Sequence, residues 1–316
     1  MFKLVLSDMD NTLIPIGRSH VSARTLVAIQ ALRAAGIEFG PCTGRGPVEL
    51  APFFLHDAGY FQTGVLYNGQ TVYVDGELVS ESLCAPADLR RLQEAALEHP
   101  GTCLFYYPLA TDEANPAYCV GASAEEAAAY GRRYRFTPHV VDAAPEVPYV
   151  SVTVATTGGE GVVGAVRDAA REQGLALELV ETFPGWCDVL PRGVNKASGI
   201  RVLARELGVS RDEVVFFGDA ENDLAAIAEV ENSVAVANAM PAAARAARWH
   251  VGACADDGVA VAMVDIALAA QRGERPAFMR GAGREGTGRE GVPATVRGTG
   301  REGGPATDTR RGGRNR

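Results

Sequence analysis

Two aspartates, Asp8 and Asp10, directly follow the apolar segment FKLVLS at residues 2–7. A short apolar run is typical of a buried strand, and open α/β sheets hold their ligand sites at the carboxyl ends of the strands. Residues i and i+2 of an extended segment point to the same side, so both carboxylates can reach one reacting group. Paired carboxylates are suited to nucleophilic and general acid-base catalysis. The pair is a weak signal by itself, because aspartates also cap helices and occupy loops.

Two later positions could bind phosphate. Thr43, Gly44 and Arg45 follow a second strand-like segment, IEFGPC, and this loop would lie at the same edge of the sheet as Asp8. A hydroxyl and backbone N–H groups at that edge can hold phosphate oxygens. Lys196 stands near the start of the helix-like segment KASGIRVLARELG, where a cation can neutralise a phosphate and a nucleophile together. A lone lysine is otherwise more often a solvated surface residue.

An acidic segment, DAEND at residues 219–223, follows the short apolar run VVFFG. Asp219 and Asp223 add carboxylates that could complete an oxygen-rich site for a hard cation. The alternative is an acidic loop that caps the following helix, since Asp and Asn suit helix starts.

The order of strand-like and helix-like segments predicts an α/β fold. FKLVLS, VSARTLVAIQALRAAG and IEFGPC form a β-α-β pattern, and residues 196–248 repeat the alternation. Units of this kind build parallel sheets with helices on both faces. We therefore expect a doubly wound, Rossmann-like core with a parallel sheet, made of residues 1–83 and 187–272.

Residues 84–186 show a different pattern. Strand-like segments follow one another without an intervening helix, as in TCLFYY and AYCVGA, which favours antiparallel pairs. We expect an inserted α+β cap with a mainly antiparallel sheet covered on one face. The segment YNGQ, which contains Asn68, predicts a hairpin turn near the boundary.

Composition narrows the class of protein. The 316-residue chain has a formal net charge of −9, which disfavours nonspecific nucleic-acid binding. Its six cysteines form no C-x-x-C pair, and no segment resembles a membrane span or a signal peptide, so we expect a cytoplasmic protein. Residues 273–316 repeat GREG and hold few large apolar side chains. We expect them to form a disordered Gly/Arg-rich tail, with weak RNA contacts as the alternative.

Taken in order, the four elements resemble the four motifs of the haloacid dehalogenase (HAD) phosphatases. Asn68-Gly69, the NKASGI segment, VAVANA followed by Pro241, and DGVA at residues 257–260 resemble the Cof-type branch, subclass IIB. The resemblance spans about residues 2–270 and covers the cap by element order only. The chain departs from the pattern at Asn11, where many relatives have glycine, and at Cys42, where a small or aliphatic residue is more usual.

The resemblance implies a Mg²⁺-dependent phosphatase in which Asp8 is transiently phosphorylated. Asp10 would be the acid that protonates the leaving group, which requires a raised pKa, and then the base that deprotonates water. Metal ligands would be the Asp8 carboxylate, the Asp10 main-chain carbonyl and Asp219, with Asp223 assisting directly or through water. The residues implied to bind the phosphorylated substrate come from several loops: Thr43, Gly44, Arg45, Asn68, Lys196 and Asn222.

The cap would close over the site and choose the leaving group. Trp186, Tyr106, Tyr107 and Asp188 are candidates to contact it, although aromatic residues there are more often core. We expect a phosphomonoester hydrolase that acts on a small phosphorylated metabolite, such as a sugar phosphate or a phosphorylated cofactor. The alternatives are a phosphomutase of the same subclass and a non-catalytic binding protein whose basic tail engages RNA or another acidic partner.

Overall fold

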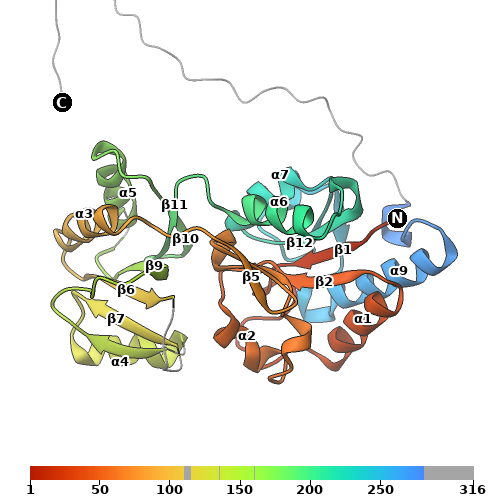
Figure 1. Ribbon diagram of the computed structural model, residues 1–316, viewed down its shortest axis with the longest axis horizontal. Coiled ribbons are helices and arrows are strands. Elements are labelled where there is room, and N and C mark those ends of the chain that lie inside the picture. Colours follow the sequence, from red (N-terminus) through yellow and green to blue (C-terminus); the bar gives the residue numbers. More distant parts are fainter. Residues whose placement is uncertain (110–114, 135, 160, 281–316) are drawn as a thin grey trace, which may run out of the picture. The chain divides into compact units, whose positions relative to one another are not determined.

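The computed structural model describes residues 1–109, 115–134, 136–159 and 161–280. Its first sheet is parallel throughout and has the strand order β14-β13-β12-β1-β2. Figure 1 labels its strands β12, β1 and β2. The strands of this sheet are β1 (Leu4–Ser7), β2 (Glu38–Pro41), β12 (Val214–Gly218), β13 (Asn232–Val236) and β14 (Trp249–Val251). The predicted parallel α/β core is confirmed, and β14 is an additional edge strand that the sequence did not indicate.

Helices cover both faces of the parallel sheet (Figure 1). Side chains alternate along each strand, so Val5 and Phe217 face one side while Leu6 and Phe216 face the other. The first side packs on α1 (Ala23–Ala34) and α9 (Gly258–Arg272). The second packs on α6 (Lys196–Glu206), α7 (Leu224–Glu229) and α8 (Pro241–Ala246). This arrangement is the predicted doubly wound one.

A small antiparallel sheet adjoins the loop after β2. It consists of β3 (Gly64–Leu66), β4 (Thr71–Val74) and β5 (Glu77–Glu81). The predicted turn at YNGQ connects β3 to β4 through the 3₁₀ turn η2 (Tyr67–Gly69). The short segments between and around the core strands are α2 (Pro47–Phe53), η1 (Ala58–Tyr60), η3 (Arg211–Glu213), η4 (Glu221–Asp223) and η5 (Cys254–Asp256).

The second large sheet has the order β10-β11-β9-β6-β7-β8. Its strands are β6 (Thr102–Pro108), β7 (Pro116–Val120), β8 (Thr137–Val140), β9 (Tyr149–Thr156), β10 (Leu177–Phe183) and β11 (Trp186–Pro191). Four of the five strand pairs are antiparallel and only β7 and β8 run parallel, so the prediction of a mainly antiparallel sheet is confirmed.

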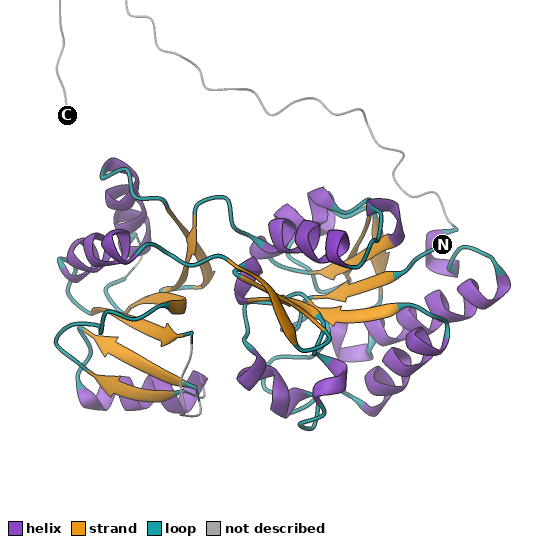
Figure 2. Cartoon of the chain, in the orientation of Figure 1, coloured by secondary structure: helices purple, strands orange, loops and turns teal. Residues whose placement is uncertain are grey.

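Helices lie on both sides of this second sheet, so the expectation of a sheet covered on one face is wrong (Figure 2). The helices α3 (Pro86–Leu97) and α5 (Val162–Glu172) pack on the face that carries Leu104 and Val154. The helix α4 (Ala124–Tyr134) packs against Phe105 and Trp186 on the opposite face. Phe105 and Trp186 gave the second face an apolar patch that a helix could cover.

Two predicted boundaries differ from the packing. The predicted return to the core at residue 187 falls inside β11, because β11 pairs with β9 and β10 as far as Pro191. The predicted tail begins at Gly273, yet η6 (Ala277–Met279) buries Met279 in the core cluster with α9. The rest of the predicted tail, residues 281–316, lies outside the described residues. The division into core, cap and tail stays a prediction with these two boundaries moved.

Within the described part of the chain, no helix combines the length and the hydropathy needed to cross a bilayer.

Candidate active site

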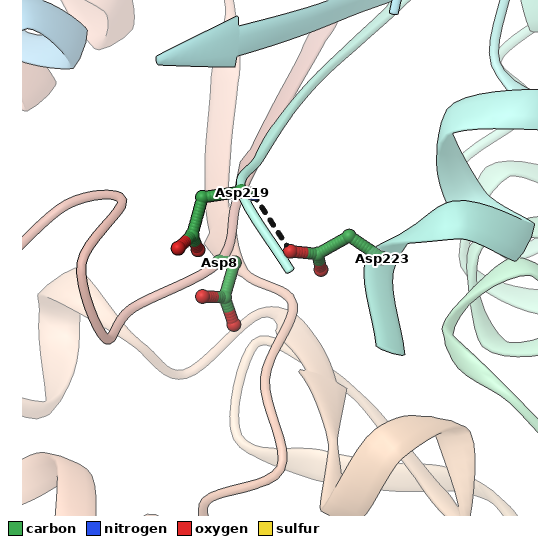
Figure 3. A group of neighbouring side chains, drawn as sticks. All are labelled: Asp8, Asp219 and Asp223. Carbon is green, nitrogen blue, oxygen red and sulfur yellow. Dashed lines mark hydrogen bonds between the residues drawn. The ribbon is translucent and has the colours of Figure 1, made fainter. Parts of the chain in front are cut away.

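Three buried carboxylates meet at the carboxyl end of the parallel sheet. Asp8 follows β1, Asp219 follows β12, and Asp223 ends the turn η4. One carboxylate oxygen of each lies within 4.8 Å of the others. Figure 3 shows the three side chains converging from separate segments. Because β1 and β12 pair in parallel with Ser7 opposite Phe217, the residues that follow these strands begin side by side.

Lys196, the first residue of α6, is fully buried beneath this group. Its Nζ lies 2.6 Å from Oδ1 of Asp8 and 2.6 Å from Oδ1 of Asp223. The start of α6 is fixed because the Asn195 side chain accepts a hydrogen bond from the backbone N–H of Ser198. The structure thus places the predicted phosphate-binding lysine directly on the predicted nucleophile.

The loop after β12 depends on a close approach at Gly218. Oδ2 of Asp223 accepts hydrogen bonds from the backbone N–H groups of Asp219 and Ala220, at 2.9 and 3.0 Å. A Cβ atom on residue 218 would lie 2.7 Å from Cγ of Asp223. Glycine therefore lets the Asp223 side chain lie over the end of the strand, where Oδ1 of Asp223 contacts Lys196.

Thr12 joins the group, although it was not among the predicted site residues. Its hydroxyl donates to Oδ1 of Asp219 at 2.7 Å. The signal was present, since Thr12 ends the string D-x-D-x-T. Asn11 has φ 58°, in the left-handed region that favours glycine and that asparagine also adopts. The departure from glycine at Asn11 therefore keeps the turn between Asp10 and Thr12.

Arg45 holds the carboxylate of Asp10 by both oxygens. Nε lies 2.7 Å from Oδ2 and Nη2 lies 2.8 Å from Oδ1, a bidentate geometry that is stronger and more directional than a single contact. The same guanidinium lies 3.6 Å from Glu49 and 4.8 Å from the ring centroid of Phe53. Arg45, which was predicted to contact the substrate, therefore also orients Asp10.

The hairpin turn supports the Thr43 loop. The backbone N–H of Thr43 donates to Val65, and its carbonyl accepts from the N–H of Asn68, both at 2.9 Å. A Cβ atom on Gly44 would lie 3.0 Å from Nδ2 of Asn68, so the loop and the turn touch closely. The loop is held by β3 and η2 as well as by the strand that precedes it.

A chain of hydrogen bonds runs from the acidic loop to the second sheet. Nδ2 of Asn222 donates to Oδ1 of Asn68 at 3.2 Å, and Nδ2 of Asn68 donates to Oδ2 of Asp188 at 3.0 Å. The hydroxyl of Thr153 donates to Oδ1 of Asp188 at 3.4 Å. The buried Asn68, which has a left-handed φ of 54°, thus links η4 to β11.

These groups surround one cavity of about 430 Å³. The predicted site residues that line it are Asp8, Asp10, Thr43, Gly44, Arg45, Asp219 and Asn222. Lys196, Asp223 and Asn68 lie behind this lining and bind to its members. The cavity also has lining residues that the sequence did not single out: Ile16, Glu49, Tyr67, Ser151, Thr153, Thr182, Asn238 and Met240.

Three of the four residues proposed to contact the leaving group line the cavity, namely Tyr107, Trp186 and Asp188. The prediction for Tyr106 is wrong. Its side chain is buried on the other face of β6, where its hydroxyl donates to Oε1 of Gln93 at 2.9 Å. Neighbouring residues of a strand point to opposite faces, so Tyr106 and Tyr107 could not both reach the cavity.

Burial raises the pKa of several carboxyl groups in the site. The pKa of Asp8 lies well above its usual range because of burial; Lys196 opposes the shift, whereas Asp223 and Asp219 add to it. Burial also raises the pKa of Asp219 to about 6, against the hydrogen bond from Thr12. Burial tends to lower the pKa of Lys196, but Asp223 and Asp8 raise it above its ordinary value, so the ammonium stays charged.

The three converging carboxylates fit a divalent cation. They supply only hard oxygen atoms. Beyond the effect of burial, the charges of Asp223 and Asp219 raise the pKa of Asp8, so the three groups repel one another despite Lys196. A cation held by Asp8, Asp219 and Asp223 would relieve this repulsion. The donor set therefore suits a metal ion that prefers oxygen ligands.

Comparison with known proteins defines the class. The family model for haloacid dehalogenase-like hydrolases matches residues 5–263, which includes every element of the site. The chain belongs to this family of hydrolases, whose members generally use a metal ion. The expectation of a HAD-type phosphatase is confirmed at the level of the family and of its phosphatase relatives.

Relatives of known name extend over most of the chain. It is 28% identical over 280 residues to the phosphatase-family protein YxeH of Bacillus subtilis, covering 85% of this chain and 100% of YxeH. It is 26% identical over 258 residues to 5-amino-6-(5-phospho-D-ribitylamino)uracil phosphatase YbjI of Escherichia coli, covering 81% and 93%. HMP-PP phosphatase of Escherichia coli is 29% identical over 253 residues, covering 76% and 86%.

Solved structures share the fold at lower identity. SMU.1108c of Streptococcus mutans superposes with a TM-score of 0.73 at 17% identity, covering 83% of this chain and 98% of that chain. The HAD subclass IIB sugar phosphatase BT4131 superposes with a TM-score of 0.69 at 20% identity, covering 83% and 97%. The Cof-type resemblance is thereby confirmed for the fold.

Proposed function

We propose that the protein is a Mg²⁺-dependent phosphomonoester hydrolase that acts through an aspartyl phosphate on Asp8. The observation that carries the proposal is the placement of Asp8. Its carboxylate is buried at the cavity, in contact with Lys196 and beside Asp219 and Asp223. A nucleophile in that position has a neighbouring ammonium group to offset the charge of an approaching phosphate, and the adjacent carboxylates could hold a metal ion that would do the same.

In the first step, a carboxylate oxygen of Asp8 attacks phosphorus, and the bond from phosphorus to the leaving oxygen breaks. Asp10 gives its proton to that oxygen. In the structure Arg45 occupies both oxygens of Asp10. A phosphate dianion would compete for Arg45, and Asp10 would then lose the cation that neutralises it and could carry the proton.

In the second step, Asp10 accepts a proton from water, and the water oxygen attacks phosphorus. The bond between phosphorus and Asp8 breaks, which releases inorganic phosphate and restores the Asp8 carboxylate. Thr43 and Lys196 hold phosphoryl oxygens in both steps, and Asn222 lies at the same edge of the cavity. Phosphoryl transfer depends mainly on such positioning and charge stabilisation.

Mg²⁺ is the cation proposed for the Asp8, Asp219 and Asp223 group, together with the main-chain carbonyl of Asp10. When bound, it would offset the repulsion between Asp8 and the phosphate. Mg²⁺ in proteins is usually bound through one or two carboxylates, and water and phosphate complete its coordination.

The proposed substrate is a small phosphorylated metabolite, either a sugar phosphate or a phosphorylated cofactor. A cavity of about 430 Å³ has room for a ligand of that size. The names of YbjI and of HMP-PP phosphatase also refer to small phosphorylated compounds. The six cysteines, all free and buried, support the further proposal that the protein works in the reducing cytoplasm.

The test is phosphate release from p-nitrophenyl phosphate with and without Mg²⁺. We expect Mg²⁺-dependent turnover by the wild type and a loss of at least about 10³-fold in Asp8→Asn, because the amide is not a nucleophile. Asp168→Asn, an identical change on the outer surface of α5, serves as the matched control. Equal turnover by Asp8→Asn and the wild type would refute the proposed role of Asp8.

A further inference from the structure

One face of the second sheet is divided into an apolar part and a polar part. The strand register places Phe105 opposite Thr153, and Thr153 opposite Asp188, so these residues share a face with Trp186. Phe105 and Trp186 pack under α4, whereas Thr153 and Asp188 line the cavity. The polar part continues with Ser151, which pairs with Tyr107 and also lines the cavity.

The polar part presents hydroxyl groups around a single carboxyl group. Ser151, Thr153, Thr182 and Tyr107 each carry a hydroxyl, and each can donate or accept a hydrogen bond. Nothing in phosphoryl transfer by Asp8 and Asp10 requires this wall. Its chemistry is therefore available to recognise the part of the substrate that leaves.

Asp188 differs from Asp8 and Asp10 in its partners. It accepts hydrogen bonds from the amide of Asn68 and the hydroxyl of Thr153, and both groups are neutral. Asp10, by comparison, is neutralised by a bidentate arginine, and Asp8 by Lys196. Each carboxylate oxygen can accept more than one hydrogen bond, so Asp188 keeps acceptor capacity for a ligand.

The charges around the cavity disfavour a second anion. Among the described residues that line it, five carry carboxyl groups and Arg45 carries the one positive charge: the five are Asp8, Asp10, Glu49, Asp188 and Asp219. Lys196 and a bound metal ion would neutralise the charges of Asp8, Asp219 and the phosphate that reacts. A carboxylate or second phosphate on the leaving group would face Asp188 and Glu49 without a free cation among these lining residues, and such like-charge contacts are costly.

We propose that Asp188 is a specificity-determining residue that selects monophosphate esters of neutral, hydroxyl-rich leaving groups and rejects leaving groups with a second anionic group. A hydroxyl of the leaving group donates to Asp188, and the hydroxyl groups of Ser151 and Thr153 bind its neighbours. The same wall disfavours the bisphosphate activator that a phosphomutase would need. This inference rests on the proposed phosphatase function and assigns its substrate class.

A matched pair of substrates tests the inference. Sorbitol 6-phosphate and 6-phosphogluconate have the same open six-carbon chain and differ at the far end, which is CH₂OH in one and a carboxylate in the other. We expect kcat/KM of the wild type to be at least about 30-fold higher for sorbitol 6-phosphate, because a buried like-charge contact is costly. A ratio near one would overturn the inference without any variant.

The variant Asp188→Asn assigns the selectivity to this residue. Its amide oxygen can still accept from Asn68, but its negative charge and an acceptor are lost. We expect the ratio of the two kcat/KM values to fall by about tenfold, because kcat/KM falls for sorbitol 6-phosphate and rises for 6-phosphogluconate. Because the ratio is taken within one protein, a general loss of activity does not change it. Asp168→Asn on α5, which removes the same charge away from the cavity, should keep the wild-type ratio.

The outcomes separate this inference from the proposed function. Absence of p-nitrophenyl phosphate turnover with Mg²⁺ would refute the phosphatase proposal alone. The selectivity would then be read from binding, as the shift in melting temperature that each member of the pair produces in the wild type and in Asp188→Asn. A wild-type ratio or shift that Asp188→Asn leaves unchanged would overturn the role of Asp188, even in an active phosphatase.

Discussion

The two walls of the cavity contain carboxylates in different settings. On the wall formed by the parallel sheet, Asp8 and Asp223 share the buried ammonium group of Lys196. On the wall formed by the second sheet, Asp188 has only neutral hydrogen-bond partners among those observed, Asn68 and Thr153. A charge that is compensated inside the protein is suited to a fixed reaction centre. A charge without such compensation is suited to discrimination, because the ligand must supply its complement.

The largest effect is expected from removing the cation of the wall formed by the parallel sheet, which we call the compensated wall. Lys196→Met keeps most of the side-chain length but leaves Asp8 and Asp223 without their shared cation. The free energy of unfolding should fall by about 3–5 kcal/mol, as it does when one partner of a buried ion pair is removed. Turnover of p-nitrophenyl phosphate should fall by at least about 10²-fold, because the phosphate loses a cationic contact. Urea unfolding and phosphate release measure the two effects.

The control for Lys196→Met is Arg201→Met, which removes a cation from the same helix. Arg201 pairs with Glu229 at 2.9 Å, but its side chain is 54% exposed. Exposed pairs contribute about 0–1 kcal/mol, so this variant should stay close to the wild type in both assays. Equal losses in the two variants would show that burial between Asp8 and Asp223 is not what makes Lys196 important.

A smaller effect is expected from displacing one carboxylate of the compensated wall. The added methyl group of Gly218→Ala would contact Asp223, so Asp223 must move. We expect a loss of about 1–3 kcal/mol from overpacking and roughly a tenfold rise in the Mg²⁺ concentration that gives half-maximal turnover. A Mg²⁺ titration of initial rates measures the second effect.

Gly164→Ala is the matched control for this change. Gly164 lies inside α5 with no atom near the position of its Cβ, so alanine should stabilise the protein by about 0.5–1 kcal/mol. The Mg²⁺ dependence should not move. If both alanine variants shifted the Mg²⁺ dependence alike, the close approach at Gly218 would not be its cause.

The two walls also differ in how well they could be predicted from the sequence. Asp8, Asp10, Thr43 and Asp219 could be brought to one edge because each follows a strand of a β-α-β pattern, and parallel strands share an edge. Lys196 was predicted to neutralise the nucleophile, but its second contact, with Asp223, could not be foreseen, because it depends on the position of α6 over the sheet. The fold of the core was also predictable, because alternating strand-like and helix-like segments predict a parallel sheet.

The second sheet was less predictable, because its strands pair in an order that the local pattern does not contain. Tyr106 and Tyr107 are equivalent in composition, and only the register of β6 decides which one faces the cavity. The role of Met279 at the end of the core was hidden by the Gly/Arg-rich segment that follows it. These errors arise where tertiary pairing, and not local pattern, decides the outcome.

The smallest expected effect is on the pH dependence of stability, to which Asp188 contributes. Burial, together with Glu49, raises the pKa of Asp188 to about 7, against the hydrogen bonds from Asn68 and Thr153. The unfolded value is about 3.9, so the native state binds this proton more tightly, and stability must fall as pH rises from about 4 through 7. Asp188→Asn removes this dependence. Its melting temperature should therefore rise relative to the wild type between pH 5 and pH 8, by an amount on the order of 2–4 °C for each 1 kcal/mol.

A carboxylate with the opposite shift is the control. Glu213 accepts from Lys3 and Ser210, which lowers its pKa to about 2. Stability from this group is complete above the unfolded value of about 4.3 and is lost only as pH falls toward 2. Glu213→Gln should therefore differ from the wild type by a constant amount between pH 5 and pH 8. Melting curves with the metal removed measure both differences, and the other carboxylates of the site cancel because they are common to each pair. A constant difference for Asp188→Asn over this range would mean that Asn68 and Thr153 alone suffice to hold the charge of Asp188, and that the contrast drawn between the two walls is wrong.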